Sequence, residues 1–278
     1  MGALLALASA VCYGIADFTG GLLSRRTHFV TVALVGQAGG LLLSAVAAAL
    51  VPATSPHPAD LAWGALSGVG TGLGMLFLYR GLARGAMSVV VPVSAVGGVA
   101  LPVLVGVAVL NDRPSAVSWL GTAVALPALW LVGRARPGDG PVAPAASAAG
   151  LAAGCGIALQ YLALAQAGDG SGLWPVVAGR AAAVVTIAPL AAAAPARLRT
   201  TVRRAAGAAA TGMTASAALV FYLLALREQL VSIAVVLSSL YPAIPVLLGV
   251  TVLRERLTRA QLTGVTAAGA AVALLALG

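Results

Sequence analysis

Long apolar segments separated by short polar connections are the feature that most restricts how this chain can fold. A helix needs about 20 apolar residues to cross the hydrocarbon layer of a bilayer. Only 8% of the residues are charged, against roughly 25% in soluble domains, so the charges are too few to cover a water-facing surface. Ten segments have about the required length, at roughly residues 3–24, 29–51, 60–79, 86–110, 115–133, 143–167, 172–194, 205–226, 230–253 and 259–277. The sequence therefore predicts an all-α integral membrane protein with about ten transmembrane helices, the first of them retained rather than cleaved as a signal peptide.

The second half of the chain resembles the first at a shift of 143 positions. The run PVLVGVAVLNDRPSAVSWLG from Pro102 matches PVLLGVTVLRERLTRAQLTG from Pro245 at nine of twenty positions. The same shift aligns Cys12 with Cys155, Tyr79 with Tyr222, Gln37 with Arg180, and Asp17 with Gln160. Each half has five predicted spans. Because five is an odd number, the second copy crosses the membrane in the opposite direction. We therefore predict two inverted repeats of five helices, 1–137 and 138–278, an arrangement that recurs in secondary transporters.

The distribution of arginine supports this inversion and predicts an orientation. The chain has 16 basic residues, all of them arginine. The connections on one side of the membrane hold thirteen of them, at positions 25, 26, 80, 84, 134, 136, 197, 199, 203, 204, 254, 256 and 259. The opposite connections hold only Arg113 and Arg227. The positive-inside rule then predicts a multi-pass protein of the cell membrane with both termini outside the cytoplasm. Arginines at span ends fit a topological role, so no nucleic-acid partner is expected.

The C-terminal block SLYPAIPVLLGVTVLRERLTRAQLTGVTAAGAAVALLA, from Ser239, carries a family resemblance. Its proline-containing helix, its Glu255–Thr258 corner and the following Gln261 and Gly264 resemble the closing helices of an EamA-type member of the drug/metabolite transporter superfamily. YGIADFTGG from Tyr13 resembles the polar opening helix of such proteins. The resemblance implies five plus five spans and transport of small metabolites, often export. Such proteins are usually drawn with cytoplasmic termini, whereas the arginine count here indicates the opposite.

Two charged residues lie well inside predicted spans, Asp17 and Arg180. A charge at the centre of a membrane helix costs about 2.5–3.5 kcal/mol on insertion scales, so such residues are candidates for function. Asp17 could hold a substrate amine or carry a coupling proton, and Arg180 could bind a carboxylate or phosphate. The alternatives are a hydrogen-bonded packing role for Asp17, and snorkelling or helix locking for Arg180. Our hypothesis is that both face one central cavity.

Other polar residues and prolines of the spans are candidates of second rank. Buried amides and phenols need hydrogen-bond partners, which a substrate can supply, although such side chains often only join helices. These candidates are Gln37, Gln160, Tyr13, Tyr79, Tyr161 and Tyr222. An interior proline removes a backbone hydrogen bond and tends to kink its helix. The hinge candidates are Tyr241, Pro242, Pro245 and Pro102.

The corner after the ninth predicted span is expected to be structural. Its residues are Glu255, Arg256, Thr258 and Gln261. Thr258 and Gln261 have the spacing of a capping box, and Glu255 just before the last helix suits the positive end of that helix.

These features favour secondary transport of a small molecule by alternating access. The family resemblance adds export of amino-acid-like or amine compounds as one expectation, while the residues themselves leave the substrate and the direction of transport open. Alternatives are a non-transporting membrane scaffold or lipid scramblase, and a membrane-embedded enzyme that acts on lipid-linked substrates. The chain has two histidines and scattered acids, which do not form a metal or catalytic constellation, so neither a metal, a cofactor nor an enzymatic activity is expected. The expected partners are a small-molecule substrate, a coupling proton and the lipid bilayer; the sequence predicts no oligomeric state.

Overall fold

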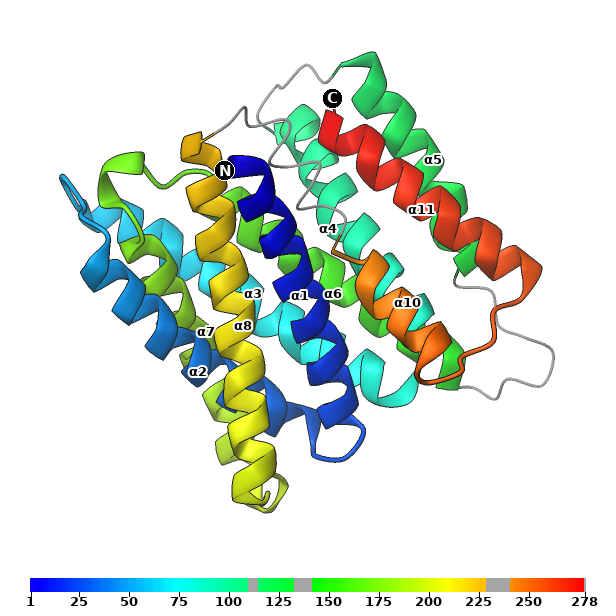
Figure 1. Cartoon of the computed structure of the whole chain (residues 1–278), viewed down its shortest axis with the longest axis horizontal. Coiled ribbons are helices and arrows are strands. Elements are labelled where there is room, and N and C mark those ends of the chain that lie inside the picture. The colour runs from blue at the N-terminus through cyan, green and yellow to red at the C-terminus, as the bar shows by residue number, and fades with distance from the viewer. Residues whose placement is uncertain (110–114, 133–141, 229–240, 278) are drawn as a thin grey trace.

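The computed structural model describes residues 1–109, 115–132, 142–228 and 241–277, and the regular elements within these ranges are helices (Figure 1). The α-helices are α1 (Gly2–Ser24), α2 (Phe29–Leu50), α3 (Pro58–Arg84), α4 (Met87–Val109), α5 (Ala116–Val132), α6 (Val142–Leu164), α7 (Trp174–Ala192), α8 (Val202–Glu228), α10 (Ala243–Thr251) and α11 (Arg259–Leu277). Two short 3-10 helices, η1 (Asp169–Ser171) and η2 (Pro195–Leu198), lie in the connections before and after α7.

The predicted spans and the observed helices agree in position. Each predicted segment overlaps one α-helix, although the segment 230–253 corresponds only to the short α10, and residues 230–240 lie outside the described part of the chain. Among the described residues, six helices are long and apolar enough to cross a membrane: α1, α2, α3, α6, α7 and α8. Residues Met87–Gly98 of α4 form a shorter apolar helix. The prediction of an all-helical fold with several helices able to cross a membrane is thereby confirmed for the described residues, while the full set of ten spans and their arrangement as two inverted repeats stay predictions.

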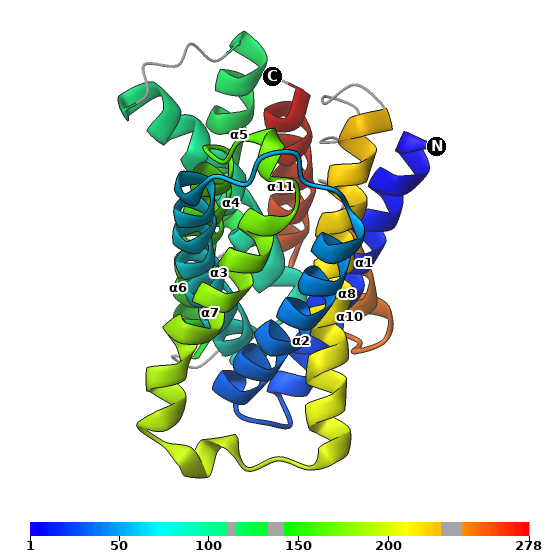
Figure 2. The same ribbon diagram turned by 90° about the vertical axis from the view of Figure 1, so that its left-hand side faces the viewer.

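The helices pack in a pattern that relates the two halves of the chain. Helix α3 packs on α6 and α7, while α8 packs on α1 and α2. Helix α2 also meets α7, and α11 packs on α5 and α4. Figure 1 shows α5 and α11 side by side, on the far side of α4 from α2. Figure 2 shows both chain ends near one end of the molecule and the connection between α7 and α8 at the other.

Close backbone approaches at glycine hold α2 against α8 and α3 against α7. A Cβ atom added to Gly212 of α8 would overlap the carbonyl group of Gly36 in α2. A Cβ atom on Gly68 of α3 would overlap the carbonyl group of Gly179 in α7. Small residues allow helices in a membrane to approach this closely. Because Gln37 follows Gly36 in the sequence, and Arg180 follows Gly179, these contacts also position the two polar residues.

Candidate functional site

The innermost polar contact joins Gln37 of α2 to Arg180 of α7. The guanidinium Nη1 of Arg180 donates a hydrogen bond to the Gln37 amide oxygen Oε1 at 2.9 Å. Both residues are buried, with 4% and 6% of their surfaces exposed. The shift of 143 aligns these two positions in the sequence, and they meet at the contact between α2 and α7.

Asp17 lies on α1 and is also buried, with 6% of its surface exposed. Within the described residues, its carboxylate accepts no hydrogen bond and forms no ion pair. It therefore does not pair directly with Arg180, whose guanidinium bonds to Gln37 instead. The two opposite charges remain separate groups near the middle of the helix bundle.

Tyrosine side chains lie near these two residues. The chain has five tyrosines, and each lies within electrostatic range of Asp17, of Arg180 or of another tyrosine in the group. Tyr13 and Tyr79 interact with both charged groups, Tyr161 does the same, and Tyr241 interacts with Asp17 and Tyr13. Tyr222 joins the group through Tyr13 and Tyr161. We call these five tyrosines together with Asp17, Gln37 and Arg180 the central polar cluster.

Two members of the central polar cluster have properties that suit ligand binding. The hydroxyl of Tyr13 is buried and has no hydrogen-bond partner among the described residues. Its ring lies 5.9 Å from the ring of Tyr241, centroid to centroid, at an interplanar angle of 53°. Tyr161, by contrast, is 39% exposed, so the cluster reaches the protein surface on α6.

Gln160, the repeat counterpart of Asp17, lies apart from these contacts. It is buried on α6, where a Cβ atom on Gly70 of α3 would come close to its backbone nitrogen. Within the described part of the chain, its amide makes no hydrogen bond to a member of the central polar cluster. The structure therefore brings together seven of the eight predicted substrate or coupling candidates, and Gln160 is the one that it leaves separate.

The hinge candidates lie in two places. Tyr241 and Pro242 immediately precede α10, and Pro245 falls in its first turn, where a missing N–H leaves no helix hydrogen bond unmade. Pro102 lies within α4, and its side chain is outside the described part of the structure. Tyr241 was predicted only as a hinge residue, and the structure makes it a member of the central polar cluster. The residue type of Tyr241 could have indicated this membership, because all five tyrosines belong to the central polar cluster.

The corner after α10 makes two sets of hydrogen bonds. Thr258 N–H donates to Gln261 Oε1 at 3.0 Å, and Gln261 N–H donates to Thr258 Oγ1 at 3.1 Å, the reciprocal bonds of a capping box. Arg256 is exposed.

Glu255 caps a different helix from the expected one. Its carboxylate accepts hydrogen bonds from Met87 N–H at 2.9 Å and from Ser88 N–H at 3.0 Å. These residues lie at the start of α4, whereas the sequence predicted a contact with the start of α11.

Arg25 completes this corner, and sequence reasoning gave it only a topological role. Its Nη2 contacts Glu255 Oε1 at 3.0 Å and also donates to the Gly85 carbonyl at 3.1 Å. Burial alone would raise the pKa of Glu255, but the hydrogen bonds from Ser88, Met87 and Arg25 outweigh it and hold that pKa below its ordinary value. The corner thereby ties the α1–α2, α3–α4 and α10–α11 connections together.

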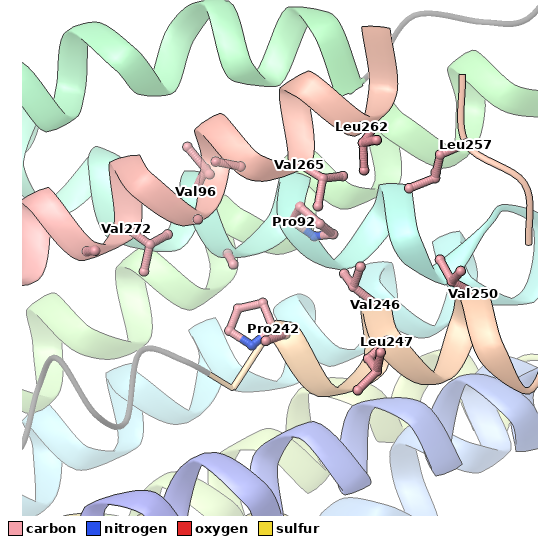
Figure 3. A pocket seen from close by; sticks show the side chains of 15 residues that line it. Pro92, Val96, Pro242, Val246, Leu247, Val250, Leu257, Leu262, Val265 and Val272 are labelled. Atoms are coloured by element: carbon pink, nitrogen blue, oxygen red, sulfur yellow. The ribbon is translucent and has the colours of Figure 1, made fainter. Parts of the chain in front are cut away.

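A groove that the sequence did not indicate lies between α4, α10 and α11. Its volume is about 480 Å³, and each described residue that lines it is apolar (Figure 3). Pro92 and Val96 of α4 face Val246 of α10 and Val265 of α11 across it. Because α4 is distant in sequence from α10 and α11, no local pattern could have indicated the groove.

Comparisons with known proteins agree with the predicted resemblance. Residues 1–134 match the family model described as the EamA-like transporter family. No protein in a curated set matches this chain. A solved structure titled "Crystal structure of protein" is similar over 98% of this chain and 96% of its own, at 19% sequence identity and a TM-score of 0.56. That likeness shows a shared fold. The apolar helices indicate a multi-pass membrane protein.

Proposed function

We propose that this chain, whose residues 1–134 match the EamA-like transporter family, is a secondary transporter that moves a small metabolite by alternating access. The helix contacts support two inverted repeats. Adding 143 to the residue numbers of α1, α2 and α3 places them on α6, α7 and α8. The packing of α3 on α6 and α7 then corresponds to the packing of α8 on α1 and α2. Two such units can rock against each other about a site near the membrane midplane.

The observation that carries this proposal is the pair of buried, separate charges in the central polar cluster. Arg180 uses one donor on Gln37, and a guanidinium has five, so donors remain for a carboxylate. Asp17 is a buried acid with no described charge partner, an arrangement that is costly unless a ligand neutralises it. A small zwitterion would satisfy both groups, with its amine at Asp17 and its carboxylate at Arg180. The cargo is therefore an amino-acid-like compound.

Asp17 also suits a coupling role. A buried carboxyl can exchange a proton for the substrate amine, since either one removes the uncompensated negative charge. Tyr13, with its unpartnered hydroxyl, can donate a hydrogen bond to the same ligand. Tyr241 and Pro242, at the start of α10, form the hinge of the motion, with Pro102 inside α4 as a further point of bending.

Flux measurements in proteoliposomes test this function. The purified protein is reconstituted with a set of radiolabelled amino acids and amines, with and without an imposed pH gradient. We expect uptake of at least one zwitterion, and Asp17→Asn and Arg180→Gln to lower its flux roughly 30-fold or more, because each leaves the opposite ligand charge buried and unpaired. Thr186→Val is the matched control on α7, since the Thr186 hydroxyl bonds only to the Ala182 carbonyl of its own helix.

The outcomes separate transport from the other interpretations. Substrate-induced thermal stabilisation of the purified protein, lost in both charge variants but kept in Thr186→Val, would show that the residues bind the cargo rather than maintain the fold. Full flux in both charge variants would remove Asp17 and Arg180 from the mechanism. Absence of any flux together with lipid scrambling would favour the scramblase alternative.

A further inference from the structure

The apolar groove between α4, α10 and α11 is open toward the lipid. Leu247 and Leu262 line it and are 62% and 54% exposed. On helices of a membrane protein, such surfaces contact acyl chains rather than water. Gly269 also lines the groove, and a Cβ atom built there meets no atom within 4 Å. The groove is therefore unfilled space at the lipid-facing surface.

The length of the groove fits one leaflet of the bilayer. Along α11 it extends from Leu262 to Ala273, which is roughly 16 Å at the rise of an α-helix. The hydrocarbon core is about 30 Å thick, so the groove covers about half of it. It begins at Leu257, in the arginine-rich connection before α11, and extends from there toward the membrane centre.

Three arginines lie where the groove begins. Arg254, Arg256 and Arg259 are exposed, and none of them forms a salt bridge within the described residues. The nearest acid in the sequence, Glu255, does not neutralise them, because its carboxylate bonds to Arg25 and to the start of α4. This end of the groove is therefore strongly positive, while its walls are wholly apolar.

We propose that the groove binds an anionic phospholipid of the arginine-rich leaflet. One acyl chain lies between α4, α10 and α11, and the phosphate headgroup contacts Arg256 and Arg259. Clusters of arginine beside grooves between membrane helices suit anionic headgroups, because the positive charges and the apolar walls match the two parts of such a lipid. This site is separate from the central polar cluster and does not depend on the transport proposal.

Native mass spectrometry of the full-length protein, released from detergent and titrated with phosphatidylglycerol or phosphatidylcholine, tests the site. We expect one phosphatidylglycerol to bind more tightly than phosphatidylcholine. A Cβ atom at Gly269 meets open space, so Gly269→Leu places its side chain in the groove, displaces at least two methylene groups of the acyl chain and should weaken that binding roughly tenfold. Ala270 is an exposed position of α11 that does not line the groove. Ala270→Leu adds a side chain of the same size and should change the binding of phosphatidylglycerol less than twofold.

The headgroup is tested separately from the acyl chain. Arg256→Gln combined with Arg259→Gln should remove the preference for phosphatidylglycerol while leaving the binding of phosphatidylcholine unchanged. Equal affinity of the wild-type protein for the two lipids would overturn the anionic part of the proposal. Unchanged phosphatidylglycerol binding in Gly269→Leu would show that the lipid does not bind in the groove. A wild-type dimer that Gly269→Leu converts to a monomer would also overturn the proposal, because the groove would then bind a second copy of the chain.

Discussion

At the scale of single residues, the hydrogen bond from Arg180 to Gln37 gives the buried guanidinium of Arg180 a partner inside the helix bundle. Both residues are buried, and the amide oxygen of Gln37 is the described acceptor for Arg180. A buried charge is far more costly without a hydrogen-bond partner than with one. Gln37 therefore holds the Arg180 guanidinium in place inside the bundle.

Replacing Gln37 by Met keeps the length of the side chain and removes this acceptor. We expect Gln37→Met to lower the stability of the protein by about 1–3 kcal/mol, the cost of leaving a buried charged donor unpaired. Thermal unfolding in detergent, followed by circular dichroism, measures the effect, with Thr186→Val as the control. A melting temperature equal to that of the wild type would show that Arg180 has another partner.

Glu255 is the second residue whose contacts have a measurable consequence. Its pKa is lowered in the folded protein because, despite burial, hydrogen bonds from Ser88, Met87 and Arg25 favour the carboxylate. A lowered pKa means that the stabilisation is complete above the ordinary value of about 4.3 and is lost as the pH falls through the lower folded-state pKa. Glu255→Gln should therefore destabilise the protein at pH 7 by about 1–3 kcal/mol, which a lower melting temperature would show. The difference from the wild type should become smaller as the pH falls below 4. Glu228→Gln, at an exposed position of α8, is the control, and an equal loss at every pH would contradict the assignment.

At the scale of elements, the closeness of α2 and α8 depends on the absence of side chains at Gly36 and Gly212. A methyl group on Gly212 would overlap the carbonyl group of Gly36, so α2 and α8 would have to separate. Because Gln37 follows Gly36, such a separation would also disturb the central polar cluster.

The pair Gly212→Ala and Gly269→Ala tests this packing with one chemical change at two sites. Gly212→Ala should destabilise the protein by about 1–3 kcal/mol, the usual cost of overpacking. Gly269→Ala, which meets open space, should be neutral or stabilising by up to about 1 kcal/mol, because alanine favours a helix. Thermal unfolding of both variants in the same detergent gives the comparison. Equal melting temperatures would mean that the α2–α8 contact is not tightly packed.

At the scale of the whole molecule, the proposed inversion of the two repeats predicts which connections share a membrane side. The α2–α3 connection bonds to the α6–α7 connection, because Ser55 N–H donates to the Gly170 carbonyl at 3.0 Å. Ser171 of the α6–α7 connection also donates to Asp60, in the first turn of α3, at 2.6 Å. Arg204, in the first turn of α8, donates to the Arg26 carbonyl of the arginine-rich α1–α2 connection at 3.0 Å. Each of these contacts joins the two halves of the chain.

Single-cysteine labelling tests the proposed orientation. In a background with Cys12→Ala and Cys155→Ala, a membrane-impermeant maleimide added to intact cells should label Ser55→Cys, and it should label Thr201→Cys only after the membrane is opened. Both positions are exposed, and they lie in the α2–α3 and α7–α8 connections respectively. The reverse pattern would place the termini in the cytoplasm, and labelling of both positions in intact cells would rule out their location on opposite sides.

The sequence by itself determined where the helices lie, because a membrane span requires a long apolar segment whose ends carry the charges. For the same reason it singled out Asp17 and Arg180, whose charges stand out within apolar segments, and the shift of 143 already aligned Gln37 with Arg180. Only the tertiary structure decided which of these groups touch, since Gln37, Arg180 and the five tyrosines come from helices far apart in the chain. It also placed Glu255 at the start of α4 and opened the groove beside Gly269, because such contacts depend on the relative positions of packed helices, which hydropathy does not encode.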